Sequence, residues 1–300
     1  MSDTIKTFTG SVAIVGRPNV GKSTLLNAIL GEKISITSKK PQTTRHRILG
    51  IKTMGVYQAI YLDTPGFHKN TPRQLNRTLN RTVIGALQEA DLIVFVIDCR
   101  HWTNEDDLML IRLKQQEKPV ILVLNKIDTV NDRMKLLPII DEISKKMAFS
   151  AVVPLSALKE KNVEALENVI NEHLPEGKHL FAADDITNCT DRFLTAELIR
   201  EKLMRLLGDE VPYAIRVEIE KFDDSETLLR IAALIWVEKP GQKAIVIGHK
   251  GEMLKKVGQL AREDMEALFE KKVFLHLWVK IKENWTDDDN LAQYLGHADR

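Results

Sequence analysis

Residues 16–23 read Gly-Arg-Pro-Asn-Val-Gly-Lys-Ser, which matches the pattern G-x-x-x-x-G-K-[ST] of a phosphate-binding loop. Gly16 and Gly21 allow the tight backbone wrap in which successive N–H groups point at phosphate oxygens. Lys22 can reach the β- and γ-phosphates of a nucleotide, and the hydroxyl of Ser23 can bind Mg²⁺. The residues predicted to bind a nucleotide here are Gly16, Arg17, Pro18, Asn19, Val20, Gly21, Lys22, Ser23 and Thr24.

The segments around this loop alternate between strand-length apolar runs and helical patterns up to about residue 176. Strands separated by helices indicate a doubly wound α/β domain with a mostly parallel sheet. One antiparallel hairpin is expected, between residues 47–53 and 57–62, with its turn at Met54 and Gly55. The other expected strands are 11–15, 92–97, 120–124 and 151–155, and the expected helices are 22–30, 74–88, 106–116, 134–147 and 162–174.

A second phosphate-sensing loop is predicted directly after the strand 57–62, where the chain reads Asp-Thr-Pro-Gly. Asp63 would hold Mg²⁺ through water, and the N–H of Gly66 would sense the γ-phosphate. The D-x-x-G pattern alone is equally well explained by an ordinary turn, but its place behind a phosphate loop favours the nucleotide interpretation. The predicted contacts are Asp63, Thr64, Pro65, Gly66 and Phe67.

Base selection is predicted at residues 125–128, Asn-Lys-Ile-Asp, which close the apolar strand 120–124. The Asp128 carboxylate can accept hydrogen bonds from N1–H and the exocyclic amine of guanine, a pair that adenine does not offer. The stem of Lys126 can cover the base, and Asn125 can brace the loop. After the last strand, backbone N–H groups of residues 156–158 can donate to guanine O6. The residues predicted to bind the base are Asn125, Lys126, Ile127, Asp128, Ser156, Ala157 and Leu158.

The α/β alternation stops near residue 176, and a polar stretch at 177–190 is the predicted linker to a second domain at 191–300. This domain reads as an amphipathic helix at 193–207, strands at 213–221 and 228–238, helical pieces around Gly248, a helix at 258–269 and a strand at 273–281. The order of these elements predicts an α+β module and not a continuation of the first sheet.

A G-x-x-G loop in this module lets backbone approach a nucleic-acid backbone closely, and lysines at 239, 243, 250, 255 and 256 surround it. Alone, the motif is more often a plain turn between helices. Ile245, Ile247 and Leu254 can line an apolar base groove or belong to the core, and Trp278 and Trp285 can stack on bases or, for Trp278, pack inside. The predicted RNA contacts are Ile247, Gly248, His249, Lys250, Gly251, Lys243 and Lys255.

Composition is that of an ordinary soluble globular protein. Of the 300 residues, 44% are hydrophobic and 28% are charged, and the formal net charge is only +1, so any nucleic-acid surface must be local. Cys99 and Cys189 form no metal-ligand spacing. A disulfide between them is possible in principle, but two isolated cysteines fit a reducing cytosol better. No apolar run is long enough to span a bilayer, and the N-terminus lacks the pattern of a signal peptide.

With these motifs in register, the chain resembles the translation-factor-related GTPases and, within them, the Era family. The resemblance implies a Ras-like P-loop GTPase domain followed by a type II KH domain, which binds single-stranded RNA. It implies hydrolysis of GTP with Mg²⁺, binding to the 3′ end of 16S ribosomal RNA, and assistance to small-subunit assembly by a monomer. A cytoplasmic location with peripheral membrane contact is also implied, although no residue supports the membrane contact independently.

Hydrolysis in such a protein would be slow without help, because Phe67 stands where Ras-like proteins place a water-orienting glutamine. Residues 42–47 look like the family's first switch loop, in which Thr43 or Thr44 would complete the Mg²⁺ shell; Thr44 is favoured. Asn19 matches an asparagine that helps related GTPases to bind an activating K⁺ ion, although it can also simply cap the turn. The resemblance thus assigns catalytic roles to Lys22, Thr44, Gly66 and Asn19.

Three other functions compete with this interpretation. A P-loop kinase or metabolic ATPase is disfavoured by the Asn-Lys-Ile-Asp motif. An RNA-binding protein with a vestigial nucleotide site is disfavoured by the complete set of phosphate-site residues. A related RNA-modification GTPase would carry different accessory domains, and this chain ends without the reactive cysteine that often closes them.

Overall fold

The structure is a computed structural model and describes residues 6–38, 40, 43–67, 74–132, 134, 136–208 and 215–283. The chain forms two compact units. The first comprises Met1–Ser35 and Thr44–Asn188, and the second comprises Ile36–Thr43 and Cys189–Arg300. The boundary near residue 188 falls inside the predicted linker, whereas the grouping of the short segment 36–43 with the second unit was not expected.

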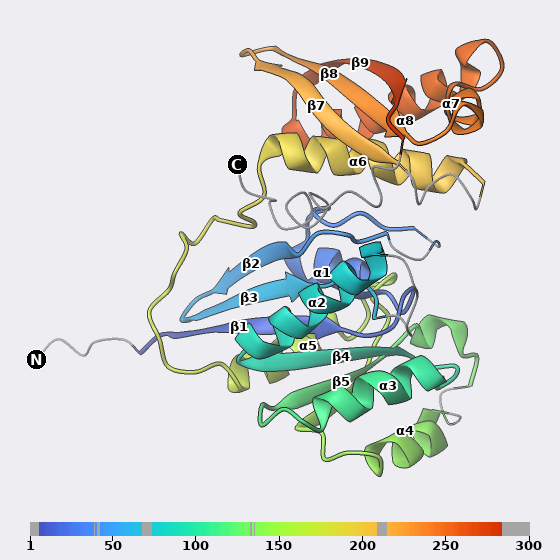
Figure 1. Cartoon of the computed structure of the whole chain (residues 1–300). Helices are drawn as coiled ribbons and strands as arrows, with labels where there is room; N and C mark the ends of the chain where they lie inside the picture. The colour runs from blue at the N-terminus through green and yellow to red at the C-terminus, as the bar shows by residue number, and fades with distance from the viewer. Residues whose placement is uncertain are drawn as a thin grey trace, which may run out of the picture. The chain divides into compact units, whose positions relative to one another are not determined.

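The first unit is built on a six-stranded sheet in the order β2-β3-β1-β4-β5-β6 (Figure 1). Only β2 and β3 pair antiparallel, which confirms the predicted hairpin within a mostly parallel sheet. All seven residues of β4 are buried because helices cover both faces of this central strand. The strands are β1 (Phe8–Val15), β2 (Ile48–Met54), β3 (Tyr57–Asp63), β4 (Leu92–Asp98), β5 (Val120–Asn125) and β6 (Ala151–Pro154).

Helices cover the two faces of this sheet, with α1 and α5 against one another on one side and α2, α3 and α4 sharing an apolar core on the other. The helix α3 begins at Asn104, two residues before the expected start, because Thr103 and Asp106 form a capping box. The helices are α1 (Lys22–Leu30), α2 (Gln74–Glu89), α3 (Asn104–Leu113), α4 (Leu136–Ser144) and α5 (Val163–Glu172), with a short 3₁₀ helix, η1, at Ile127–Thr129.

The segment after α5 is irregular but fastened to the first unit. Gln58 is fully buried, accepts hydrogen bonds from the backbone N–H groups of Leu180 and Phe181, and donates to the carbonyl of Phe181. Farther along, the N–H of Ile51 on the edge strand β2 donates to the carbonyl of Ile186 at 2.7 Å. The linker therefore covers part of the edge of the sheet at β2, which would otherwise be open to solvent.

The second unit contains a three-stranded sheet in the order β7-β8-β9, with β7–β8 antiparallel and β8–β9 parallel (Figure 1). Its helices pack with the sheet around one apolar core. The elements are α6 (Asp191–Leu206), β7 (Arg216–Asp224), β8 (Leu228–Val237), α7 (Pro240–Ile247), the 3₁₀ turn η4 (His249–Gly251), α8 (Glu252–Phe269) and β9 (Lys272–Ile281).

Two predictions for this unit were wrong in detail. The helix predicted to begin at Gly258 begins at Glu252, because Gly251 adopts a left-handed conformation and ends the preceding turn. The helix α6 is not simply amphipathic, since its charged residues Glu197, Arg200, Glu201 and Lys202 are buried along with its apolar ones. Ion pairs and hydrogen bonds satisfy these buried charges, as is required away from water.

Two further expectations can be compared with the described residues. Cys99 and Cys189 are both buried and are not joined in a disulfide in the described part of the chain. Within the described part of the chain, every helix is too short or too polar to cross a bilayer.

Candidate functional site

The phosphate-binding loop joins β1 to α1, as its sequence predicts. Gly21 has φ +101°, and a Cβ on it would lie 2.3 Å from the side-chain nitrogen of Asn125, so only glycine fits this position. Lys22 is buried, and its ammonium donates to the carbonyls of Gly16 and Arg17 at 3.1 Å each. The loop is thereby closed around the Lys22 ammonium, with α1 starting at the point where a phosphate would bind.

Ser23, Thr44 and Asp63 meet beside this loop. The Ser23 hydroxyl lies 2.8 Å from Thr44 Oγ1 and donates to Asp63 Oδ2, also at 2.8 Å. Asp63 is fully buried, and its Oδ1 has no hydrogen-bond partner among the described residues. Thr43 instead bonds to Ser38 and Lys40, so the geometry favours Thr44 over Thr43. Three clustered oxygen groups, one an orphaned carboxylate oxygen, fit a hard cation such as Mg²⁺.

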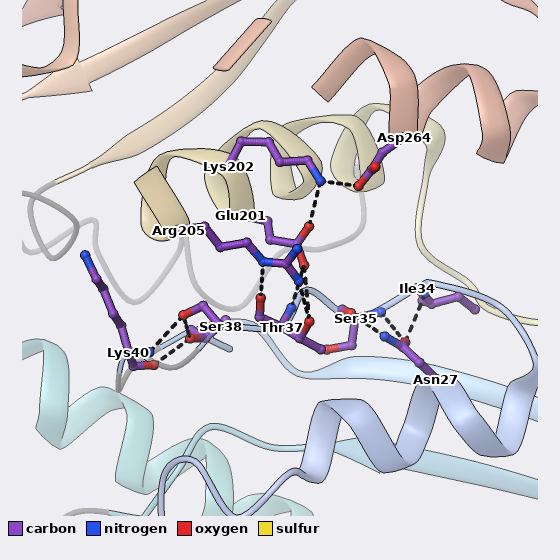
Figure 2. A network of polar contacts seen from close by, with 11 residues as sticks. Asn27, Ile34, Ser35, Thr37, Ser38, Lys40, Glu201, Lys202, Arg205 and Asp264 are labelled. Atoms are coloured by element: carbon purple, nitrogen blue, oxygen red, sulfur yellow. Dashed lines mark hydrogen bonds and ion pairs between the residues drawn. The ribbon is translucent and has the colours of Figure 1, made fainter. Parts of the chain in front are cut away.

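Ser35 is a member of this cluster that its sequence did not reveal. It is fully buried and donates to Asp63 Oδ2 at 2.8 Å. Asn27 of α1 holds Ser35 in place, because its side chain bonds to the backbone N–H and the carbonyl of Ser35 and to the N–H of Ile34 (Figure 2). No motif includes a serine at this distance from the loop, so only the fold could identify it.

Protonation of Lys22 is expected to couple nucleotide binding to pH. Burial lowers the pKa of Lys22 to about 8, partly offset by Asp63. A bound phosphate stabilises the ammonium and raises this pKa again, so nucleotide binding takes up a proton above pH 8. We expect GDP affinity to fall up to about tenfold per pH unit above pH 8.

Calorimetry of GDP binding in two buffers of different ionisation enthalpy measures this proton. At about pH 8.5, Lys22 should take up most of one proton for each GDP bound, whereas at about pH 6.5 it should take up hardly any proton. Equal proton counts at both pH values would contradict the assignment.

The second phosphate-sensing loop follows β3 as predicted. Thr64 is buried and donates from its hydroxyl to the carbonyl of Ile14 on β1. Phe67 is 5% exposed within the core shared by α2, α3 and α4, and the Arg112 guanidinium lies 5.0 Å from the centre of its ring. A side chain enclosed in this way contributes nothing toward orienting an attacking water. Of the expected second switch, residues 66–81, the part 68–73 lies outside the described residues, and Gln74 begins α2.

The guanine loop follows β5 as predicted. Asn125 is buried; its amide donates to the carbonyl of Val20 in the phosphate loop, and its side-chain oxygen accepts from the N–H of Ala157. The Ser156 hydroxyl donates to the Asp128 carboxylate, which is itself exposed and available to a base. Leu158 is 71% exposed beside this loop. Asn125 therefore connects its own guanine loop to the phosphate loop and to the loop at residues 156–158.

Arg17 has a partner that the motif did not predict. Its guanidinium lies 3.2 Å from the carboxylate of Asp106, which is fully buried in the first turn of α3. The same carboxylate forms the capping box with Thr103. Arg17 therefore anchors the phosphate loop to α3.

The segment Ile36–Thr43, which contains part of the predicted first switch, packs on α6 within the second unit (Figure 2). Glu201 accepts from the backbone N–H of Thr37 at 2.9 Å and from its hydroxyl at 3.3 Å. Arg205 donates to the carbonyl and the hydroxyl of Thr37 at 3.0 and 2.8 Å, and Arg200 donates to the carbonyl of Thr43. Residue 42 of the expected switch loop lies outside the described residues, as do residues 39 and 41 before it.

The G-x-x-G loop lies between α7 and α8, as expected for an RNA contact. Gly248 has φ +73°, and a Cβ there would lie 2.6 Å from Met253 Cβ, so glycine is required. Lys250 and Lys255 are exposed and Lys243 is partly exposed. His249 and Lys250 stand at the tip of the loop, where a phosphate backbone can reach them.

An adjoining groove of about 530 Å³ lies between α8 and β9. Leu254 lines the groove and also packs against the core. Ile247 packs against the core, and neither Ile245 nor Ile247 lines the groove. Phe274 of β9 lines it and is 60% exposed, which makes it a stacking candidate that periodicity did not reveal. Trp278 is partly buried beside His276, and Trp285 lies outside the described residues.

Comparison with known proteins agrees with both halves of the chain. Residues 11–126 match the family model "50S ribosome-binding GTPase", and residues 210–286 match the family model "KH domain". GTPase Era of Pseudomonas syringae pv. tomato is 53% identical over 299 residues, which is 100% of both chains. GTPase Era of Yersinia pestis is 51% identical over 300 residues, 100% of this chain and 99% of its own.

Solved structures agree as well. A crystal structure of Era in complex with MgGDPNP and nucleotides 1506–1542 of 16S ribosomal RNA superposes with TM-score 0.92 at 41% identity, covering 98% of this chain and 100% of that one. An Aquifex aeolicus Era variant bound to GDP and AlF4⁻ superposes with TM-score 0.93 at 40% identity. Full-length identity above half, the shared fold and the complete nucleotide site lead to one conclusion: the chain belongs to the GTPase Era family, with a Ras-like GTPase domain that hydrolyses GTP and a C-terminal KH domain.

Proposed function

We propose that this GTPase is a molecular switch that binds the 3′ end of 16S ribosomal RNA and assists maturation of the small ribosomal subunit. One observation carries the proposal: a complete guanine-nucleotide site and a lysine-flanked G-x-x-G groove occur in one chain that matches GTPase Era over its full length. The solved Era complex with a 16S fragment supports the choice of RNA.

Binding to a labelled single-stranded RNA with the sequence of the 16S 3′ end tests the proposal. Fluorescence anisotropy should give an affinity at least about tenfold higher than for a scrambled RNA of the same length. Equal affinity for the two RNAs would show that the protein binds RNA without this sequence preference and would contradict the proposed target.

Mg²⁺ is part of the same proposal. Ser23 and Thr44 would bind the ion directly through their hydroxyls, and Asp63 would hold it through water. The bound ion would neutralise negative charge on the phosphates. Burial raises the pKa of Asp63, so a neighbouring cation would favour its ionised form.

The segment 36–43 is proposed to couple the nucleotide to the RNA groove. Thr44, the proposed Mg²⁺ ligand, directly follows Thr43, whose carbonyl is held by Arg200. From Thr37 a line of polar contacts runs through Glu201 and Lys202 to Asp264 on α8, the helix that lines the groove (Figure 2). A change in segment 36–43 on GTP binding would therefore act on α6 and α8.

Thr37→Val tests this coupling because it removes the hydroxyl and keeps the volume. In the unmodified protein, RNA affinity should differ at least about fivefold between GDP and a non-hydrolysable GTP analogue, and Thr37→Val should reduce this ratio. Ser225→Ala, which removes a hydroxyl in the β7–β8 turn, should leave the ratio unchanged. Identical affinity in both nucleotide states of the unmodified protein would rule out coupling altogether.

An activating K⁺ ion at Asn19 is proposed to compensate for the missing glutamine, since Phe67 is enclosed in the core. Asn19 is exposed in the phosphate loop with φ +62°. Replacing NaCl by KCl at constant ionic strength should raise the hydrolysis rate about tenfold, and Asn19→Ala should abolish the increase. Equal rates in the two salts would remove K⁺ from the proposal.

We further propose that the protein acts as a monomer in the cytoplasm, with peripheral contact to the cell membrane. Sedimentation of cell fractions at low and high salt tests the contact, because peripheral binding is released by salt. Protein found only in the soluble fraction at low salt would argue against it.

A further inference from the structure

Asp98, the last residue of β4, lies outside every motif considered above. Its side chain is only 2% exposed. In the register of the parallel strands β4 and β5, Asp98 pairs with Asn125, and the N–H of Cys99 donates to the carbonyl of Asn125 at 2.9 Å. Because parallel strands end at the same edge of a sheet, the fold places this carboxylate directly beside the guanine loop.

Two cations hold the Asp98 carboxylate. Arg100 donates from Nε to Oδ1 at 2.8 Å and from Nη2 to Oδ2 at 2.6 Å, and the ammonium of Lys126 lies 3.0 Å from Oδ2. Burial by itself raises the pKa of Asp98, but hydrogen bonds from Arg100 and Lys126 outweigh burial and hold the pKa well below its ordinary value. Asp98 is therefore ionised, and these partners offset the cost of keeping the charge out of water.

Lys126 spans the gap between two loops. Its ammonium, besides pairing with Asp98, donates to the backbone carbonyl of Asn19 in the phosphate loop at 2.6 Å. Both residues have left-handed backbone, with φ +70° for Lys126 and +62° for Asn19. Asparagine tolerates this conformation, but for a lysine it is unfavourable, so at Lys126 it persists where surrounding contacts enforce it.

The two loops are thus joined at two points of different character. Asn125 makes a neutral, buried hydrogen bond to the carbonyl of Val20 at 2.8 Å. Lys126 makes a charged contact one residue earlier in the phosphate loop, at a side chain that is 28% exposed. A flexible lysine at such a position is not held by packing, so its place depends on the carboxylate beside it.

We propose that Asp98 is a positioning residue for guanine-nucleotide binding. It holds the ammonium of Lys126 against the carbonyl of Asn19, and this keeps the base-selecting loop and the phosphate loop at the separation that one nucleotide must span. The stem of Lys126 is then extended along the base position before the nucleotide arrives. The proposal depends on guanine-nucleotide binding by the first unit and is independent of the RNA target.

Asp98→Asn tests the proposal, since the amide keeps the shape and removes the charge. A fluorescent GDP analogue should dissociate about tenfold faster from the variant, because the loops separate more readily. IDP lacks the exocyclic amine that Asp128 binds, so the preference for GDP over IDP reports on Asp128. Asp98→Asn leaves Asp128 in place, and this preference should not change. A purely structural defect would instead slow association or alter this preference.

A double-mutant cycle with Lys126→Met shows whether Asp98 acts through Lys126. Lys126→Met keeps most of the stem and should also speed dissociation about tenfold, and adding Asp98→Asn to it should change the rate less than about twofold. Arg100→Gln is the matched control: it removes the other partner of Asp98, and dissociation should stay within about twofold of the unmodified protein.

Three results would overturn the proposal: unchanged dissociation from Asp98→Asn, an equal acceleration in both Lys126 backgrounds, or an equal acceleration from Arg100→Gln. Thermal unfolding of each variant with GDP absent verifies that it folds. If Asp98→Asn does not fold, Lys126→Met tests the proposal instead. Dissociation of the GDP analogue from Lys126→Met at the rate of the unmodified protein would show that the ammonium does not hold the two loops together. Absence of GDP binding by the unmodified protein would instead refute the guanine site itself.

Discussion

Asp128→Asn is expected to lower the affinity for GDP by about 100-fold and to make XDP the preferred ligand. The carboxylate of Asp128 is exposed at the end of the guanine loop and is oriented by the Ser156 hydroxyl. Two hydrogen bonds from guanine to a charged acceptor are lost, each worth about 1.5–3 kcal/mol. The amide oxygen of asparagine can still accept from N1–H, and its NH₂ group can donate to the 2-oxo group of xanthine, which restores two hydrogen bonds.

Competition of GDP and XDP for a fluorescent nucleotide measures this exchange. The fold should be unaffected, because the Asp128 side chain is exposed and its hydrogen bond is with the side chain of Ser156. Equal weakening of both nucleotides, with no gain for XDP, would show that Asp128 supports the loop and does not select the base.

His249→Asp combined with Lys250→Asp is expected to reduce RNA affinity by about 100-fold at moderate salt. Both side chains are exposed at the tip of the G-x-x-G loop, where an RNA backbone would pass. The change replaces a positive charge by two negative ones facing phosphates, and electrostatics supplies much of nucleic-acid affinity. Aspartate tolerates the left-handed conformation of Lys250, which has φ +47°, so the turn should survive.

GDP affinity is the internal control for this variant, since the changed residues belong to the second unit, and it should stay within about twofold. Lys145→Asp, a reversal of an exposed charge directly after α4, should leave RNA affinity nearly intact. Persistent RNA binding by the double variant would place the RNA somewhere other than the G-x-x-G groove.

Local sequence determined the nucleotide site almost completely. The phosphate loop, the D-x-x-G loop and the Asn-Lys-Ile-Asp loop each carry their chemistry within a few consecutive residues. Apolar runs bounded by these motifs also predicted the parallel strands, because a strand buried on both faces must be apolar throughout. The β2–β3 hairpin followed from the turn at Gly55, which has φ +59°.

Contacts between residues far apart in the chain were decided only by the tertiary structure. Asp98, Asp106 and Ser35 support the nucleotide site through partners 28 to 89 positions away, a separation at which no periodicity or spacing operates. The groove between α8 and β9 is lined by Phe274, because the packing of β9 beside α8 decides which side chains face the groove.

The phosphate loop itself shows where this division falls. Its sequence alone was enough to predict residues 16–23 as a phosphate-binding loop, since the backbone conformation of a glycine-rich turn is a local property. Only the tertiary structure decided what holds the loop to the base-selecting loop: Asn125 and Lys126, with Asp98 behind them. It also decided that segment 36–43 packs on α6, where Glu201 is buried despite its charge. A buried charge needs specific partners: Lys202 and Arg205 on the same helix pair with Glu201, but only the fold brings the N–H of Thr37 to it.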